Sequence, residues 1–89
     1  MTEPVKIPIT DELDLHTFHP GEVEDLLTDY FDECLKKNIL TVRVIHGKGT
    51  GALKRHVRAA LARNPRVKSY RDAPAAAGGW GATVVDLLS

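Results

Sequence analysis

A carboxylate and an imidazole stand two residues apart in the segment Leu13-Asp14-Leu15-His16. Residues i and i+2 of a β-strand point to the same face, so the side chains of Asp14 and His16 lie together if this segment is a strand. The pair suits proton transfer near neutral pH, because histidine titrates there and a carboxylate orients the imidazole or holds a Mg²⁺ ion. The alternative is an exposed strand face on which Asp14 pairs with Arg43 of a neighbouring strand.

Three glycines surround a lysine in the segment His46-Gly47-Lys48-Gly49-Thr50-Gly51. Glycines let backbone N–H groups approach an anion closely, and a helix that follows adds about half a positive charge at its N-terminus. The spacing fits neither a P-loop nor a dinucleotide-binding fingerprint. We therefore expect an anion site for a phosphate backbone, the alternative being a flexible strand-to-helix turn. Its residues are His46, Gly47, Lys48, Gly49 and Gly51.

Two further features are typical of contact with nucleic acid. Trp80 is flanked by glycines and is placed to stack on an unpaired base, a contact worth ~1–3 kcal/mol; the alternative is that it folds back onto the sheet. Basic side chains form a possible track for phosphates, although for any single one a solvated surface is the alternative. The track comprises Arg43, Lys54, Arg55 and Arg58, with Arg63, Arg66 and Lys68.

The formal net charge of zero hides a strong asymmetry along the chain. Residues 1–33 hold ten acidic residues and one basic residue, whereas residues 34–71 hold eleven basic residues and no acidic one. A basic segment of this kind favours a surface that meets phosphate groups. The alternative is that the basic side chains pair with the acidic part of the chain.

Length and composition fit one small domain. The chain has 89 residues, of which 43% are hydrophobic and 27% charged, which excludes a disordered tail or a fibre. Its longest apolar runs are far shorter than the ~18 residues that span a bilayer, and its single cysteine, Cys34, excludes an internal disulfide framework. We expect a cytoplasmic protein, plausibly monomeric, with an extended arm over 1–11 that lacks signal-peptide features, and one domain over 12–89.

Hydrophobic spacing predicts the elements that position these residues. Alternating apolar residues predict strands and a 3.6-residue period predicts helices. The expected strands cover 12–16, 40–46, 67–71 and 82–88, and the expected helices cover 20–37 and 51–63. Pro20 suits a first helical position, and Asn64-Pro65 ends the second helix because a residue before proline disfavours the α region.

The element order β-α-β-α-β-β predicts an α/β two-layer sandwich. Two successive crossovers of the same hand place both helices on one face of a mixed four-stranded sheet. Leu13 and Leu15 need the covered face, so Asp14 and His16 should lie on the open one. If the first two strands run parallel, their carboxyl ends meet, and His16 and His46 flank one crevice.

Three segments together resemble the Smr (small MutS-related) domain family. They are residues 13–16 (LDLH), 46–51 (HGKGTG) and 78–85 (GGWGATVV), in the right order with helices between them. The match covers residues 12–88. The resemblance implies a β-α-β-α-β-β sandwich similar to the C-terminal domain of translation initiation factor three, and nicking or endonuclease activity on DNA or RNA. Because only an eleven-residue arm precedes the domain, the chain resembles the stand-alone members.

The resemblance also implies roles for residues. The aspartate and histidine that the family favours as its catalytic pair map to Asp14 and His16, and the substrate-binding tetrad maps to 46–49. Thr17 stands where the family usually has glycine, and because threonine does not adopt a positive φ cheaply we expect a differently shaped turn after His16.

The sequence thus leads to three hypotheses of function. The first is an endonuclease in which His16 acts as acid or base and Asp14 assists, as a Mg²⁺ ligand if a metal takes part. The second is a non-catalytic module that binds DNA, RNA or a ribosomal surface, and the third is a protein-interaction adaptor. His16 and His19 with His46 also fit a zinc site, a weak alternative because no thiolate is near and the spacing suits a turn equally well.

Overall fold

A computed structural model describes residues 9–49 and 51–89. The element order β-α-β-α-β-β is confirmed, with short 3-10 turns at Pro20–Glu22, Ala75–Ala77 and Gly79–Gly81. The strands and helices are β1 (Glu12–Asp14), α1 (Val23–Lys36), β2 (Thr41–Ile45), α2 (Ala52–Arg63), β3 (Val67–Asp72) and β4 (Ala82–Leu87). The first strand is shorter than predicted by two residues, and the first helix begins as a 3-10 turn at Pro20.

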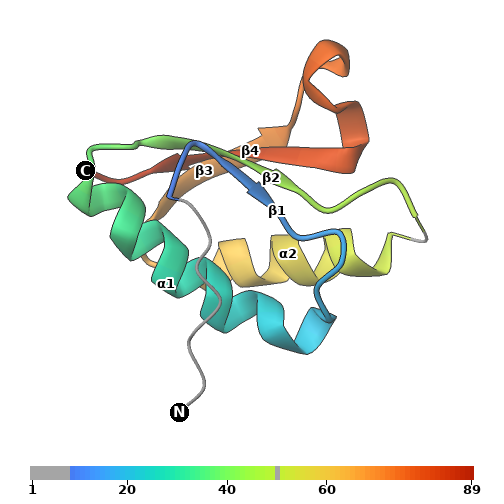
Figure 1. The fold of residues 1–89 in the computed structure, drawn as a ribbon, viewed down its shortest axis with the longest axis horizontal. Coiled ribbons are helices and arrows are strands. Elements are labelled where there is room, and N and C mark those ends of the chain that lie inside the picture. The colour runs from blue at the N-terminus through green and yellow to red at the C-terminus, as the bar shows by residue number, and fades with distance from the viewer. Residues whose placement is uncertain (1–8, 50) are drawn as a thin grey trace.

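The sheet has the strand order β1-β2-β4-β3. β1 pairs with β2 in parallel, and β4 pairs antiparallel with both β2 and β3. Both helices lie on one face, and the connections after β1, after β2 and between β3 and β4 lie at the same end of the sheet (Figure 1). The predicted two-layer sandwich with a mixed sheet is therefore confirmed, and three loops meet where parallel strands end.

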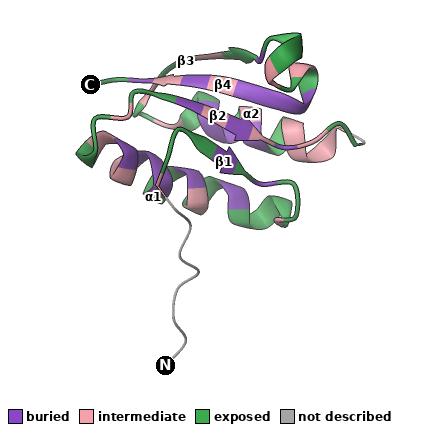
Figure 2. Ribbon diagram, turned by 45° about the horizontal axis from the view of Figure 1, so that its top comes forward, coloured by how far each residue is buried: buried purple, intermediate pink, exposed green. Residues whose placement is uncertain are grey.

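The core lies between the sheet and the helices, as the buried stripes of Figure 2 show. Leu13 and Leu15 are 1% and 0% exposed and pack in one cluster with residues of both helices, such as Phe31 and Leu61. Fully burying a side chain of this size stabilises the fold by about 1.5–3 kcal/mol. Strand alternation then leaves Asp14 on the uncovered face, as predicted.

Both helices end where the sequence predicts a stop. Asn38 adopts the left-handed conformation with φ 60°, and the Ile39 N–H donates to the Cys34 carbonyl at 2.9 Å, which closes the last turn of α1. α2 ends at Arg63, because Asn64 is extended before Pro65. No helix in the described ranges has the length and apolar character needed to cross a membrane.

The arm predicted over 1–11 is described only from Ile9 onward. Ile9 packs against the core, and Thr10 exchanges two hydrogen bonds with the Tyr30 hydroxyl, at 3.1 Å from its N–H and 2.7 Å to its carbonyl. This end of the predicted arm is therefore part of the folded domain.

Candidate active site

The site begins where β1 ends. Asp14 Oδ1 accepts a hydrogen bond from the His16 backbone N–H at 3.0 Å and lies 2.5 Å from His16 Nδ1. Burial favours a higher pKa for Asp14, but the hydrogen bonds and charge of His16 outweigh it and hold the pKa below its usual value. The carboxylate thus fixes the proton on Nδ1 and leaves His16 Nε2 as a proton acceptor. The two side chains are 49% and 58% exposed, so a ligand in solvent can reach them.

One interpretation of the sequence paired Asp14 with Arg43, and the structure does not show this pair. Arg43 stands opposite Glu12 in the parallel register and forms an ion pair with that carboxylate. Its guanidinium also donates to the Ala77 carbonyl at 2.9 Å, which ties the open face of β2 to the β3–β4 connection. Asp14 is therefore left to His16.

His46 is buried, with 4% of its surface exposed. Its Nδ1 lies 3.2 Å from the Gly47 carbonyl and its Nε2 lies 2.8 Å from Thr83 Oγ1. A carbonyl only accepts, so Nδ1 carries the proton and Nε2 accepts from the Thr83 hydroxyl. Burial lowers the pKa of His46, as do the charges of Lys54 and Arg58, which keeps the ring neutral. The expectation that His46 flanks a crevice with His16 is corrected. The His46 ring is buried, and its two nitrogens contact the Gly47 carbonyl and the Thr83 hydroxyl.

The loop after β2 is clamped onto the β3–β4 connection. The N–H groups of His46 and Gly47 both donate to the Gly81 carbonyl, at 3.1 and 2.9 Å. A Cβ on Gly81 would lie 2.8 Å from Lys48 Cγ, so only glycine allows this approach. A Cβ on Gly47, whose φ is +84°, would lie 3.7 Å from His16 Cβ. The loop therefore starts beside His16.

The N-terminus of α2 follows this loop. Gly51 precedes the helix with φ +86°, and a Cβ there would lie 3.7 Å from Arg55 Nη1. Lys48 and Gly49 are exposed, and Thr50 lies outside the described residues. The positive end of the helix and two cationic side chains thus border one surface.

The basic track divides into paired and unpaired cations. Lys54 Nζ lies 3.0 Å from Asp72 Oδ1, and Arg58 pairs with the same carboxylate. These contacts, the Lys54 hydrogen bond foremost, hold the pKa of Asp72 below its usual value. Arg43 pairs with Glu12, Arg63 with Glu24 and Arg66 with Asp32, so pairing with acidic residues accounts for much of the track. Within the described part of the chain, the cations in no ion pair are Lys37, Lys48, Arg55 and Lys68.

Trp80 does not fold back into the core, because 48% of its surface is exposed. The ammonium groups of Lys48 and Lys54 lie 5.8 and 5.9 Å from the centre of its ring. Within about 6 Å a cation is attracted to the face of an indole. Trp80 therefore belongs to the same surface as the glycine loop.

Three residues at this end of the sheet were given no individual role from the sequence. They are Asp72, which binds two cations of α2, Thr83, which fixes the ring of His46, and Gly81, whose carbonyl holds the loop. A signal exists for Thr83: it shares the inward face of β4 with Val85 and Leu87, and a polar residue in such a row needs a buried partner.

The structure gives no support to the zinc alternative. Within the described residues no three His, Cys, Asp or Glu side chains come together in a group that could hold a metal ion, so His16, His19 and His46 form no such group. For Mg²⁺, Asp14 offers one carboxylate at the site, and its Oδ1 already accepts from His16. Mg²⁺ bound there would take its other ligands from water and a substrate phosphate.

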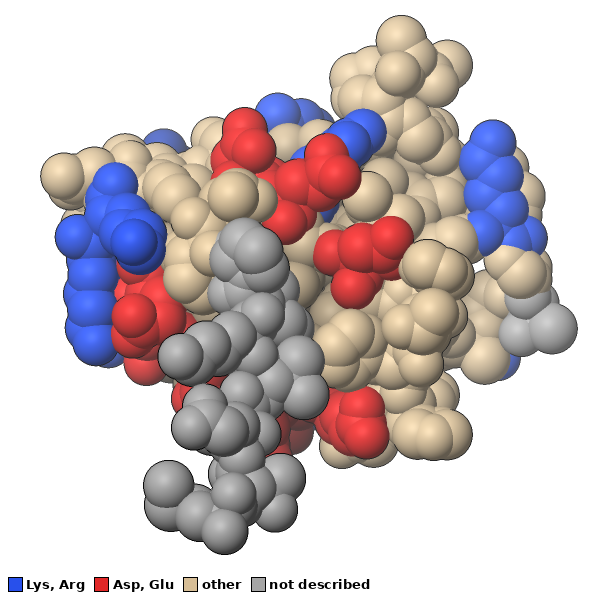
Figure 3. Space-filling view, viewed as in Figure 1, with Lys and Arg blue, Asp and Glu red and all other residues tan. Residues whose placement is uncertain are grey.

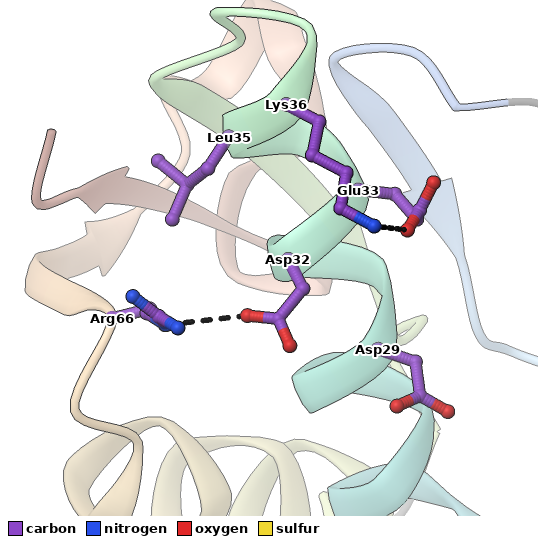
Figure 4. A pocket seen from close by; sticks show the side chains of 6 residues that line it. All are labelled: Asp29, Asp32, Glu33, Leu35, Lys36 and Arg66. Atoms are coloured by element: carbon purple, nitrogen blue, oxygen red, sulfur yellow. Dashed lines mark hydrogen bonds and ion pairs between the residues drawn. The ribbon is translucent and has the colours of Figure 1, made fainter.

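A surface hollow of about 550 Å³ lies away from these residues, between α1 and the turn before β3 (Figure 4). Its walls are Asp29, Asp32, Glu33, Leu35, Lys36 and Arg66. Arg66 reaches Asp32 at 3.2 Å and Lys36 reaches Glu33 at 2.9 Å, so four of its charged side chains satisfy one another. On the face shown in Figure 3, acidic residues lie in the middle, and Lys and Arg lie at the left and right edges and along the top. The hollow shares no residue with the candidate site.

The chain is similar in sequence to known proteins. The family model described as Smr domain matches residues 13–88. Endonuclease MutS2 of Halalkalibacterium halodurans is 44% identical over 79 residues, which is 89% of this chain and 10% of the relative. Endonuclease MutS2 of Thermus thermophilus is 42% identical over 76 residues, 85% of this chain and 10% of the relative. The chain therefore spans about a tenth of the length of these curated relatives.

Two solved structures share the fold. The crystal structure of the Smr domain of Thermus thermophilus MutS2 superposes with a TM-score of 0.84 and 40% identity, covering 90% of this chain and 100% of that one. YdaL, a stand-alone small MutS-related protein from Escherichia coli, gives a TM-score of 0.76 and 26% identity, covering 96% of this chain and 70% of that one.

Proposed function

Because this chain belongs to the Smr domain family, we propose that it is a nucleic-acid endonuclease that hydrolyses phosphodiester bonds in DNA or RNA. The observation that carries the proposal is the exposed Asp14–His16 pair, 2.5 Å between Oδ1 and Nδ1, directly beside a glycine loop that presents Lys48. The relatives with which it shares 42–44% identity are endonucleases by name. As part of the same proposal, the protein is located in the cytoplasm, where nucleic acid is available.

In the proposed reaction His16 is the general base. Its Nε2 removes a proton from water while the water oxygen forms a bond to phosphorus. The bond from phosphorus to the leaving sugar oxygen breaks, that oxygen takes a proton from solvent, and His16 returns its proton to solvent. Asp14 accepts the Nδ1–H bond throughout and stabilises the imidazolium. A positioned general base of this kind contributes about 10²–10⁴-fold to the rate.

The phosphate is held by the cations that have no acidic partner in the described residues. Lys48 and Arg55 flank the start of α2, and their charges together with the helix N-terminus suit the non-bridging oxygens of a phosphate. Donors aimed at charge that develops in the transition state each contribute about 10²–10³-fold. Lys48 is therefore expected to serve both binding and rate.

The test uses supercoiled plasmid and a structured RNA, each with Mg²⁺ and with EDTA. We expect His16→Ala to lower cleavage by about 100-fold or more, and Asp14→Asn to lower it less, because the histidine remains. His19→Ala is the matched control, since His19 is exposed three residues away and the histidine that pairs with Asp14 is His16. If purified His16→Ala protein cleaves at the same rate as the wild-type protein, the proposal is contradicted. The EDTA arm shows whether Asp14 acts as an orienting group or as a metal ligand.

A second candidate function is binding without cleavage. The observation that favours it is Trp80, which lies about 6 Å from two ammonium groups and plays no part in proton transfer. A binding module predicts a salt-sensitive complex that Lys48→Ala or Arg55→Ala weakens, with no strand scission by wild-type protein. The same plasmid and RNA samples, analysed by gel shift, separate the two functions.

A further inference from the structure

Trp80 and the two lysines near its ring form a contact surface next to the Asp14–His16 pair. We propose that this surface selects substrates that offer an unpaired base beside the cleaved phosphate, such as single strands, flaps and gaps, over intact duplex. The inference rests on the proposed endonuclease function and names the class of substrate for that site.

The indole is presented by a braced loop. The Gly79 N–H donates to the Pro74 carbonyl at 3.0 Å, and the Gly81 N–H donates to the Gly78 carbonyl at 3.1 Å. Gly78 has φ +113°, and a Cβ there would lie 3.0 Å from Ala82 Cβ, so the chain can turn this sharply only at glycine. An aromatic ring held half in solvent by such a loop is preorganised to meet a flat partner.

Contacts place this ring next to the reacting groups. The Gly81 carbonyl, directly after Trp80, accepts from the Gly47 N–H at 2.9 Å, and Gly47 lies against His16. Lys48 Nζ, 5.8 Å from the ring centre, comes from the same loop. A phosphate bound by Lys48 therefore lies between the indole and His16. A base stacked on Trp80 belongs to a nucleotide joined to that phosphate or to its neighbour.

The chemistry of stacking then limits the substrate. Bases in an intact duplex already stack on their neighbours, so their faces are closed to a side chain. An unpaired base offers a free face, and every base has one, which makes the selection tolerant of sequence. Lys54 adds a second cation near the ring, with its ammonium 5.9 Å from the ring centre and 3.0 Å from Asp72 Oδ1.

Binding to the non-cleaving His16→Ala protein tests the inference directly. Trp80 is the only tryptophan of the chain, so its fluorescence reports this surface alone. Three probes of equal length are titrated: a single-stranded oligonucleotide, the same strand with abasic central nucleotides, and a blunt duplex. We expect quenching and binding by the first, and at least about 5-fold weaker binding by the other two. Equal binding of the abasic strand overturns the inference. DNA and RNA versions of each probe show which polymer is preferred.

Variants of Trp80, followed by anisotropy of a labelled single strand, complete the test. Trp80→Ala is expected to weaken binding by about 5- to 100-fold, whereas Trp80→Phe keeps most of it because a phenyl ring still stacks. Leu88→Ala is the matched control, since Leu88 is similarly exposed but lies at the end of the chain beyond β4. If Trp80→Ala binds like wild type the inference is wrong, even if the protein cleaves. If Trp80→Ala weakens binding but the wild-type protein does not cleave, only the endonuclease proposal fails.

Discussion

Two histidines follow neighbouring parallel strands, and their surroundings are opposite. His16 follows β1, its side chain is 58% exposed, and its Nδ1 lies 2.5 Å from Asp14 Oδ1. His46 follows β2, is 4% exposed and has both ring nitrogens engaged by Thr83 and the Gly47 carbonyl. The first has a carboxylate as its hydrogen-bond partner, and the second has only neutral hydrogen-bond partners. In the proposed reaction the hydrogen-bond partner, rather than the position at a strand end, decides which histidine takes up a proton and which one holds the loop.

The largest effect that separates the two histidines is on stability. His46→Ala removes a buried ring and leaves the Thr83 hydroxyl without its acceptor, so we expect a loss of about 2–4 kcal/mol in the free energy of unfolding. His16→Ala removes an exposed side chain and is expected to stay within about 0.5 kcal/mol of wild type. Urea denaturation of both variants measures the difference. Similar losses would mean that the buried and exposed roles are not distinct.

The same comparison predicts how stability depends on pH. The pKa of His46 is lowered by burial in the folded protein, so below its usual value of 6.5 the unfolded chain binds more protons than the folded one. The contribution of the neutral ring is fully present above that pH and is lost as the pH falls through it. We expect the urea midpoint to drop between pH 7.5 and pH 5.5, and to drop less in His46→Gln. An unchanged drop in this variant would assign the effect to other groups.

The fold and the exposed pair were predictable because their signals are local. Leu13 and Leu15 need the core, and strand alternation then fixes where Asp14 and His16 point. The burial of His46 had a signal too, since it continues the inward row of Val42 and Val44 on β2. The glycine-rich context of His46 favoured an exposed loop instead, and the interaction that decides is with a residue 37 positions away.

The division of the basic track was not predictable in this way. Asp72 ends β3 and binds Lys54 and Arg58 on α2, a contact that depends on how the helix lies across the sheet. The pairing of Arg43 with Glu12 depends on the register of two strands. Neither the spacing nor the composition of a sequence specifies such long-range contacts. The sequence therefore predicted a continuous basic track, whereas most of these cations are paired with acidic residues in the structure.

A smaller effect sharpens the contrast between paired and unpaired cations. Lys48→Ala should weaken binding of a single strand by about 3- to 10-fold and lower the salt slope by about one, because one phosphate contact is lost. Asp72→Asn should tighten it by about 2- to 5-fold, because Lys54 and Arg58 are released. Asp86→Asn is the control, since its carboxylate pairs with Arg71 instead. Binding measured from 50 to 200 mM salt decides, and weaker binding by Asp72→Asn would refute the role given to that carboxylate.

The smallest effect concerns the residue after His16. Among the described non-glycine residues only Asn38 has a positive φ, so Thr17 keeps ordinary backbone geometry, and the turn closes by a bond of 2.9 Å from the Phe18 N–H to the Leu15 carbonyl. Thr17→Gly is therefore expected to leave cleavage within about 2-fold and to cost about 0.4–1 kcal/mol of stability, because glycine raises the entropy of the unfolded chain. A 10-fold gain in cleavage would show that Thr17 holds His16 away from its best position. Orientation by Asp14 would then not be sufficient for the activity of His16.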